Sequence, residues 1–454
     1  MNVKSRLKNK LIYMVFAVCA LLPLSLLFSR EIWFDEAYTL SLIQHDYGEI
    51  IDILKTDMHP PLYFVSLKLF CDIFGYTMVY SKLFSYLGYL ALLITMLVLV
   101  RKLFNERCSI ISMIALGAMP SMYLFSVQQR SYTWSIFFIT LCYLAALGYL
   151  KSGRSAYCVV LAASALAAGY NHIYALVTVG VCLGFLNIYI FVKRRQLFFK
   201  LLVADLIMAI GYSFWLFILI KQTKKAAGHY WLKSIEPTSV IMFIACVILC
   251  AVILLFKPNR NIAVVLGVVT VLGVQAVGLA VSLLIRPLYI SRYGLLAFGV
   301  AAVVIAVCLD RLDNLIRRIC CAGLCIINCI SFGITLQLEY DSSYTDFIVD
   351  FKKKLNKNDT LLYCDYSFGM ISYSLPEYTH SITIQQEWFC AFDNLEYIDQ
   401  SQIEQCGNNG ENIWFFKSTN TEMPKYIVKD FNYTIEDEFH CDYEYIELYS
   451  LSKK

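Results

Sequence analysis

Residues 261–285 read NIAVVLGVVTVLGVQAVGLAVSLLI, a continuous apolar run without a single charged side chain. A helix needs about 20 mostly apolar residues to cross the ~30 Å hydrocarbon core of a bilayer, so this run predicts a transmembrane helix. Windows of the same kind lie at 11–29, 80–100, 108–126, 129–150, 155–170, 172–192, 200–220, 238–256, 288–309 and 317–336. The sequence therefore predicts a polytopic α-helical membrane protein with about eleven spans.

The composition of the whole chain supports this class. Of 454 residues, 59% are apolar, 15% aromatic and only 16% charged, against roughly 25% charged residues in an ordinary globular protein. A water-soluble protein of this size has too few polar side chains here to cover its surface. The composition thus excludes a soluble enzyme, a disordered chain and a fibrous protein.

The net charge of +4 is the sum of two opposite parts. From residue 338 to the end there are 21 acidic residues and 9 lysines, a balance of −12, whereas residues 1–337 carry +16. We therefore expect a transmembrane domain over 1–337 and a separate acidic domain over 338–454. In the acidic domain, periodicity predicts a helix over 344–355 and strands over 360–364, 381–384, 413–416 and 445–449, which together indicate a small α/β domain.

The acidic domain contains four cysteines. Cys364, Cys390, Cys406 and Cys441 permit one or two disulfides in an oxidising compartment, and free buried thiols are an equal alternative. Their spacings fit no zinc motif.

Basic residues in the loops predict the orientation of the spans. Alternate loops beginning with the N-terminus carry 18 Lys and Arg residues, whereas the opposite loops carry 10. The side richer in Lys and Arg is normally cytoplasmic, which predicts a cytoplasmic N-terminus and an extracytoplasmic acidic domain. Residues 60–75 are apolar but too short to span, so we expect a helix lying in the outer interface, within a first outer loop over about 30–79.

Residues able to do chemistry gather in the outer loops, and charged groups close to membrane depth usually mark a pathway or a site. They stand in the segments Trp33-Phe34-Asp35-Glu36-Ala37-Tyr38, Asp57-Met58-His59-Pro60-Pro61-Leu62-Tyr63, Arg130-Ser131-Tyr132, Asn171-His172-Ile173-Tyr174 and Ser291-Arg292-Tyr293. A carboxylate can act as general base on an acceptor hydroxyl, and Arg and His can neutralise a phosphate leaving group. These residue types indicate transfer from a phosphate-activated donor at the membrane surface, although an anion transporter could use the same cations.

Each of these side chains also has a structural interpretation. A lone arginine at a helix end, such as Arg130, often extends towards the interface as an anchor. A histidine such as His172 is often a satisfied structural residue, and tyrosines at span ends often belong to the interfacial aromatic belt; Tyr63, Tyr132 and Tyr293 are of this kind. Asp35 and Glu36 are harder to explain structurally, because two adjacent carboxylates directly follow an apolar stretch.

The combination of Phe34-Asp35-Glu36 with Asp57-Met58-His59-Pro60-Pro61-Leu62-Tyr63 resembles the first outer loop of the GT-C glycosyltransferases. The nearest branch contains the protein O-mannosyltransferases and the aminoarabinose-to-lipid A transferases. Arg130-Ser131-Tyr132 and Arg292-Tyr293 are also similar to that branch, and the resemblance covers residues 1–310. It implies an inverting glycosyltransferase of the cell envelope that moves a hexosyl or pentosyl group from a polyprenyl-phosphate carrier to an acceptor on the exoplasmic side.

The resemblance also implies roles for single residues. Asp35, with Glu36 beside it, would be the general base or would orient the acceptor, and Asp57 completes the catalytic set. His59, Arg130 and Arg292 would bind the donor phosphate. The cavity would be lined by Tyr63, Tyr132, His172 and Tyr293.

The implied partners are a polyprenyl-phosphate sugar, membrane lipid and an acceptor that is a glycan, a lipid or a protein, with no nucleic acid. We assign no residue to a metal. Some members of the branch bind one through loop carboxylates, so a divalent metal is a possible cofactor.

Two alternatives come from other functional classes. A lipid-linked glycan transporter or flippase predicts internal repeats and charges at the membrane midplane, but no repeat is visible and the polar residues lie in the outer loops. A non-catalytic membrane scaffold leaves Asp35, Asp57 and His59 without a role.

Overall fold

A computed structural model describes residues 3–228, 234–255, 261–384, 387–403, 412–441 and 444–454. It divides into two compact units. The first, which we call the bundle unit, comprises Met1–Leu27, Met58–Ser66 and Ile73–Thr335. The second, the sheet unit, comprises Phe28–Asp57, Leu67–Asp72 and Leu336–Lys454, so that most of the first outer loop belongs to the unit that contains the acidic C-terminal part.

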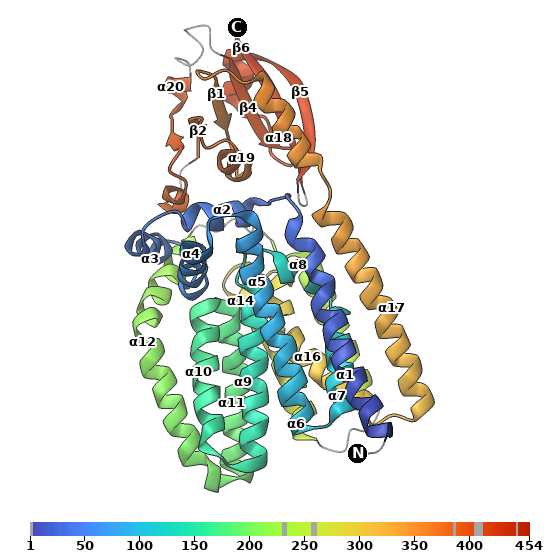
Figure 1. The fold of residues 1–454 in the computed structure, drawn as a ribbon. Helices are drawn as coiled ribbons and strands as arrows, with labels where there is room; N and C mark the ends of the chain where they lie inside the picture. Colours follow the sequence, from blue (N-terminus) through green and yellow to red (C-terminus); the bar gives the residue numbers. More distant parts are fainter. Residues whose placement is uncertain (1–2, 229–233, 256–260, 385–386, 404–411, 442–443) are drawn as a thin grey trace. The chain divides into compact units, whose positions relative to one another are not determined.

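In the described residues of the bundle unit, all regular secondary structure is helical (Figure 1). Its helices are α1 (Val3–Leu21), η1 (Leu22–Phe28), α4 (Leu62–Phe74), α5 (Met78–Thr95), η2 (Met96–Val100), α6 (Arg101–Leu103), α7 (Glu106–Gly117), α8 (Met122–Val127), α9 (Tyr132–Ser152), α10 (Ser155–Asn171), α11 (Ile173–Lys193), η3 (Arg195–Leu197), α12 (Phe198–Gly228), α13 (Pro237–Leu255), α14 (Ile262–Leu284), α15 (Ser291–Gly294), η4 (Leu295–Ala297), α16 (Phe298–Leu309) and α17 (Asn314–Glu339).

Helices occupy the predicted windows, and the polytopic helical class is confirmed. Eight helices in the described part of the chain are long and apolar enough to cross a membrane, and α10 and α13 are shorter apolar helices. The window 108–126 forms two helices, α7 and α8, because the chain turns between them at Ser121, which has a φ of 56°. The count of eleven spans therefore stays a prediction. The apolar segment at 60–75 forms α4, a helix of 13 residues, and its interfacial position also stays a prediction.

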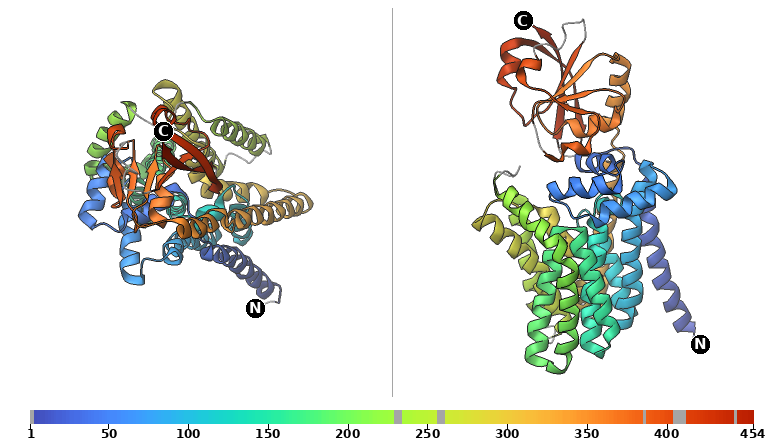
Figure 2. Two further views of the ribbon diagram at one scale, coloured as in Figure 1. Left: turned by 90° about the horizontal axis from the view of Figure 1, so that it is seen from above. Right: turned by 90° about the vertical axis from the view of Figure 1, so that its left-hand side faces the viewer.

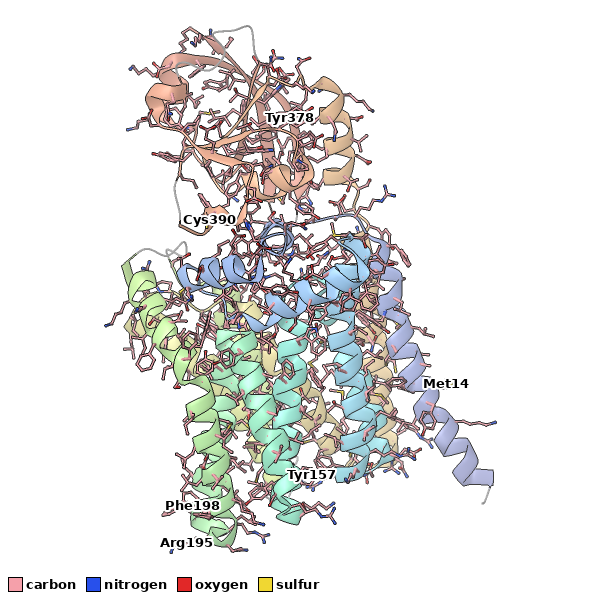
Figure 3. All side chains as sticks on the ribbon, turned by 60° about the vertical axis from the view of Figure 1, so that its left-hand side comes forward. Met14, Tyr157, Arg195, Phe198, Tyr378 and Cys390 are labelled. Carbon is pink, nitrogen blue, oxygen red and sulfur yellow. The ribbon has the colours of Figure 1, made fainter. Side chains whose placement is uncertain are left out.

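Consecutive spans pack as antiparallel neighbours, which places alternate turns at opposite ends of the bundle. Helices α9, α10 and α11 run side by side in Figure 2 and contact one another. Gly148 permits the close approach of α9 and α10, since a Cβ there would overlap the ring of Tyr157. Figure 3 shows Tyr157, Arg195 and Phe198 at one end of the bundle, so the turns before α9 and between α10 and α11 lie at the other.

The sheet unit begins with the two loop helices α2 (Phe34–Leu42) and α3 (Tyr47–Thr56). The C-terminal part adds α18 (Ser343–Lys354), β1 (Thr360–Tyr363), α19 (Phe368–Ser374), β2 (His380–Ile382), η5 (Glu387–Ala391), β3 (Leu395–Tyr397), α20 (Gln400–Ile403), β4 (Ile413–Ser418), α21 (Lys425–Asp430), β5 (Phe431–Cys441) and β6 (Glu444–Lys453). The predicted helix and all four predicted strands are present, whereas β3 and β5 were not predicted.

These strands form one mixed sheet in the order β3-β2-β1-β4-β6-β5. Strands β1 to β4 are parallel, and β6 is antiparallel to β4 and β5. Helix α18 packs on the sheet through Phe347, whose ring stacks on Phe439 with centroids 3.9 Å apart. Cys364 and Cys390 are free thiols, whereas Cys406 and the side chain of Cys441 lie outside the described part.

Candidate functional site

The turn before α9 carries the first predicted phosphate-binding residue. The Nη2 atom of Arg130 lies 2.7 Å from Nε2 of His59, and the Arg130 side chain is buried. Because a guanidinium can only donate hydrogen bonds, Nε2 of His59 is the acceptor of this one. Asn171 supports the turn, since its Nδ2 donates to the carbonyl oxygen of Ser131 at 2.8 Å.

The turn between α10 and α11 carries His172. Its Nδ1 accepts a hydrogen bond from the backbone N–H of Tyr174 at 3.0 Å and so caps α11. Asn171 links this turn to Ser131 beside Arg130, and the His172 ring packs on Tyr293 beside Arg292, so the three predicted phosphate-binding residues lie on adjoining segments of one unit.

Aromatic rings fill the space around these cations. The His172 ring lies 5.3 Å from that of Tyr293 and 6.1 Å from that of Tyr132, centroid to centroid. Tyr174 stacks on Tyr293 at 4.6 Å with an interplanar angle of 17°. Tyr63 packs elsewhere, against α5, where its hydroxyl lies 3.0 Å from Oγ of Ser85. Three of the four predicted cavity residues are therefore neighbours, and their contact with a ligand stays a prediction.

Arg292 lies on the four-residue helix α15, which is held by a carboxylate that the sequence analysis missed. The Oε2 atom of Glu236 accepts hydrogen bonds from the backbone N–H of Ser291 at 2.7 Å and from Oγ of Ser239 at 2.8 Å. Burial raises the pKa of Glu236, but hydrogen bonds from Ser291, Ser239 and Thr238 together bring it below its ordinary value. An ionised Glu236 therefore fixes the residue next to Arg292.

Lys82 is a second missed residue. It lies on α5 and its side chain is fully buried, at 0% exposure. A lysine is almost never fully buried without a compensating partner, and a charged side chain inside a span is by default a candidate functional residue. The sequence could have revealed this candidate, because Lys82 is the one charged residue in the predicted span 80–100.

The predicted carboxylates all belong to the sheet unit. Asp35 and Glu36 stand in the first turn of α2, and the Glu36 carboxylate accepts from the backbone N–H of Trp33 at 3.4 Å, which gives this buried residue a helix-capping role. The Oδ2 atom of Asp57 accepts a hydrogen bond from the hydroxyl of Tyr38 at 2.8 Å. Tyr38 therefore connects Asp57 to the helix that carries the other two carboxylates.

A metal ion needs His, Cys, Asp or Glu side chains in a suitable placement. Within the described residues, no group of three or more His, Cys, Asp and Glu side chains is suitably placed. The described residues offer arginine and histidine side chains in the bundle unit, of which Arg130 and His172 are buried, and a set of carboxylates in the sheet unit.

The fold can be compared with solved structures. The chain is similar to ArnT from Cupriavidus metallidurans in the apo state, with 12% identity and a TM-score of 0.66 over 97% of this chain and 98% of that chain. ArnT bound to undecaprenyl phosphate matches with 12% identity and a TM-score of 0.65 over 97% of both chains. The apo oligosaccharyltransferase of Archaeoglobus fulgidus matches more weakly, with 10% identity and a TM-score of 0.46 over 81% of this chain and 64% of that chain.

No family model matches the sequence, and no curated protein matches it either. At 12% identity the similarity to ArnT shows the fold alone, but it extends over almost the whole length of both chains. The chain therefore has the GT-C fold of ArnT, as the residues of its first outer loop predicted.

Proposed function

We propose that this multi-pass membrane protein is an inverting glycosyltransferase that moves a sugar from a polyprenyl-phosphate carrier to an acceptor hydroxyl. The observation that carries the proposal is the meeting of three turns in the bundle unit. Arg130 contacts His59, Asn171 beside His172 donates to Ser131 beside Arg130, and Tyr293 beside Arg292 packs on the His172 ring. A guanidinium binds phosphate oxygens through paired, charge-assisted hydrogen bonds, and a membrane lipid could deliver such a phosphate to these arginines. The shared fold with ArnT, which was solved with undecaprenyl phosphate, supports a lipid phosphate as this ligand.

In this proposal the cations act on the leaving group. As the bond between the sugar C1 and the phosphate oxygen breaks, negative charge grows on the phosphate. Arg130 and Arg292 stabilise this charge through hydrogen bonds that the guanidinium plane can make in pairs. His59 accepts from Arg130 and so orients the guanidinium. The aromatic rings of Tyr132, Tyr293 and His172 keep water away from the phosphate.

The carboxylates act on the acceptor. Asp35 takes the proton from the acceptor hydroxyl while that oxygen forms a bond to C1 on the face opposite the phosphate, which inverts the configuration. We assign the base to Asp35 rather than to Glu36, because the Glu36 carboxylate already caps α2. Asp57, held by Tyr38, would orient the acceptor.

The excess of basic residues in alternate loops supports a cytoplasmic N-terminus and places this chemistry on the exoplasmic side. In this arrangement residues 1–337 are the transmembrane domain and residues 338–454 form the extracytoplasmic domain. The acceptor would be a glycan, a lipid or a protein.

The proposal is tested with purified protein in liposomes that contain synthetic polyprenyl-phosphate sugars. Asp35→Asn should abolish transfer while leaving the binding of polyprenyl phosphate unchanged, since the amide cannot take a proton. Asp52→Asn, at an exposed carboxylate of α3 that pairs with Lys55, is the matched control and should retain transfer. Wild-type transfer by the Asp35→Asn variant would refute the general-base assignment, and no transfer by the wild-type protein from any carrier-linked sugar would refute the function.

A further inference from the structure

The loop helix α2 is packed against the C-terminal part of the sheet unit (Figure 1). We propose that this contact positions the carboxylates for the reaction, with the ring of Phe34 seated on Gly369 as its central element. The inference rests on the proposed function, because it assigns a role to the residues that hold Asp35. Phe34 and Gly369 are positioning residues in this account and do not touch the substrate.

Phe34 is surrounded by aromatic rings from the C-terminal part. Its centroid lies 5.7 Å from that of Tyr366, 5.7 Å from that of Phe368 and 6.5 Å from that of Phe392. The first two contacts are edge-to-face, at interplanar angles of 70° and 85°, the geometry that aromatic pairs prefer. Three rings therefore define one orientation for the first residue of α2.

Gly369 provides the space for this ring. A Cβ at position 369 would lie 2.5 Å from both Cδ2 and Cε2 of Phe34, which is closer than real carbon atoms approach. The backbone conformation gives no reason for a glycine here, because the described glycines with positive φ are Gly75 and Gly153. The glycine is therefore explained by the space that it leaves for the Phe34 ring. We call this space, lined by Gly369, Tyr366, Phe368 and Phe392, the Phe34 seat.

The same face of α2 connects this seat to the carboxylates. Tyr38 lies one helical turn after Phe34, so the two side chains project from the same face of the helix. Its ring lies 6.3 Å from that of Phe392, and its hydroxyl donates to Asp57. Asp35 directly follows Phe34. A shift of α2 on the aromatic seat would thus move Asp35 and Asp57 together.

Further contacts hold the loop at both ends of α2. Before it, Oε1 of Glu31 accepts from the backbone N–H of Thr345 at 3.3 Å and from its hydroxyl at 2.8 Å. After it, Nε2 of His45 lies 3.2 Å from the carbonyl oxygen of Ala391. The loop is therefore attached to the C-terminal part at three separate points, and the Phe34 seat is the point next to Asp35.

The test compares two ways of disturbing the seat in the full-length protein. Gly369→Ala forces the Phe34 ring away, and Phe34→Ala removes the ring without any clash. Misplacement of a catalytic group by about 1 Å costs on the order of 100-fold in rate. We therefore expect kcat to fall by about 10- to 100-fold in both variants. The KM for the donor should stay unchanged, because its cations belong to the bundle unit.

A double variant separates positioning from general loss of stability. Phe34→Leu shortens the side chain, so Gly369→Ala combined with Phe34→Leu should recover most of the kcat that Gly369→Ala alone loses. Ile427→Val removes one methylene from the core cluster around β4 and α21, away from the residues that contact Phe34, and should leave kcat unchanged below its melting temperature.

Two results would overturn the inference: kcat within about twofold of wild type in both Gly369→Ala and Phe34→Ala, or an equal loss of kcat in Ile427→Val. Asp35→Asn, assayed in the same preparation, distinguishes this failure from that of the proposed function. If Asp35→Asn is inactive and the seat variants are active, only the positioning role is wrong. If Asp35→Asn is active, the general-base assignment itself is wrong.

Discussion

The bundle unit and the sheet unit are built from the chain in different ways. The helices of the bundle are long local runs, such as α9 and α14, each of which forms from consecutive residues before it packs on other helices, for example α14 on α11. The sheet unit joins two stretches of the first outer loop to a C-terminal part that begins at Leu336. Its characteristic contacts, such as Phe34 with Tyr366 or Glu31 with Thr345, connect residues more than 300 positions apart.

The two units also differ in the charge of their candidate catalytic residues. The bundle unit contains Arg130, Arg292 and the buried Lys82, whereas the sheet unit contains Asp35 and Asp57. If the proposed function is correct, substitutions in the bundle should affect the donor and substitutions in the sheet unit should affect the acceptor step. Measurements of kcat and KM in variants of each unit can therefore test whether the bundle binds the donor and the sheet unit acts on the acceptor.

The largest effect is expected for Arg130→Gln. This change removes one partner of a buried, charge-assisted interaction, which typically costs 2–5 kcal/mol, so binding of polyprenyl phosphate should weaken by about 100-fold. Binding to protein in nanodiscs, measured by native mass spectrometry, checks the expectation. Arg195→Gln, at an exposed arginine at the other end of the bundle, is the matched control. Equal affinities in the two variants would contradict the donor site.

A smaller effect is expected for Glu236→Ala. Without the carboxylate, the backbone N–H of Ser291 loses its partner, and the turn that carries Arg292 becomes less ordered. We expect the KM for the donor to rise by about tenfold, the equivalent of one lost hydrogen bond to a charged group. Glu236→Gln keeps an acceptor oxygen and should lie between Ala and wild type. A change in kcat with an unchanged KM for the donor would show that Glu236 does not support donor binding.

The bundle was predictable because its signals are local. Apolar length alone predicted α9, α11 and α14, and the alternation of turns was enough to expect His172 and Arg130 at the same end. Lys82 was missed because a single lysine does little to the mean hydropathy of its span. Glu236 was missed because a lone carboxylate before a span resembles an ordinary loop residue.

The sheet unit was only partly predictable, since its key contacts are not local. Alternation predicted β1 and β4, whereas β5 was missed because it is rich in acidic residues and its pairing is interrupted between Ile435 and Asp437. No sequence pattern connects Phe34 to Gly369. Their pairing depends on how α19 packs, and this is determined by the tertiary fold rather than by propensity.

The smallest effect concerns stability rather than catalysis, and it tests whether the two units unfold separately. His380 on β2 is buried, and burial lowers its pKa to about 4. Its Nε2 lies 3.0 Å from the carbonyl oxygen of Leu375 and its Nδ1 lies 2.7 Å from the hydroxyl of Tyr363. A carbonyl oxygen can only accept, so Nε2 carries a proton. With the pKa lowered to about 4 the ring is neutral at pH 7, and Nδ1 then accepts from the Tyr363 hydroxyl.

The sign of the pH effect follows from this lowered pKa. Between pH 6.5 and 4 the unfolded chain binds a proton at His380 that the folded sheet does not. The free energy of unfolding should therefore fall by about 1.4 kcal/mol for each pH unit below 6.5, with no contribution from His380 above it. Hydrogen exchange of peptides from β1 and β2 in the full-length protein measures this loss.

His380→Gln should remove this part of the pH dependence, whereas His440→Gln, at a partly exposed histidine of the same unit, should retain it. Peptides from α9 and α14 are the internal reference, because the bundle should keep its protection while the sheet loses protection. If both sets of peptides lose protection together as the pH falls, the two units unfold as one cooperative body. In that case a substitution in either unit would alter the stability of both. Variants of the bundle and variants of the sheet unit would then no longer differ in whether they change the KM for the donor or the kcat.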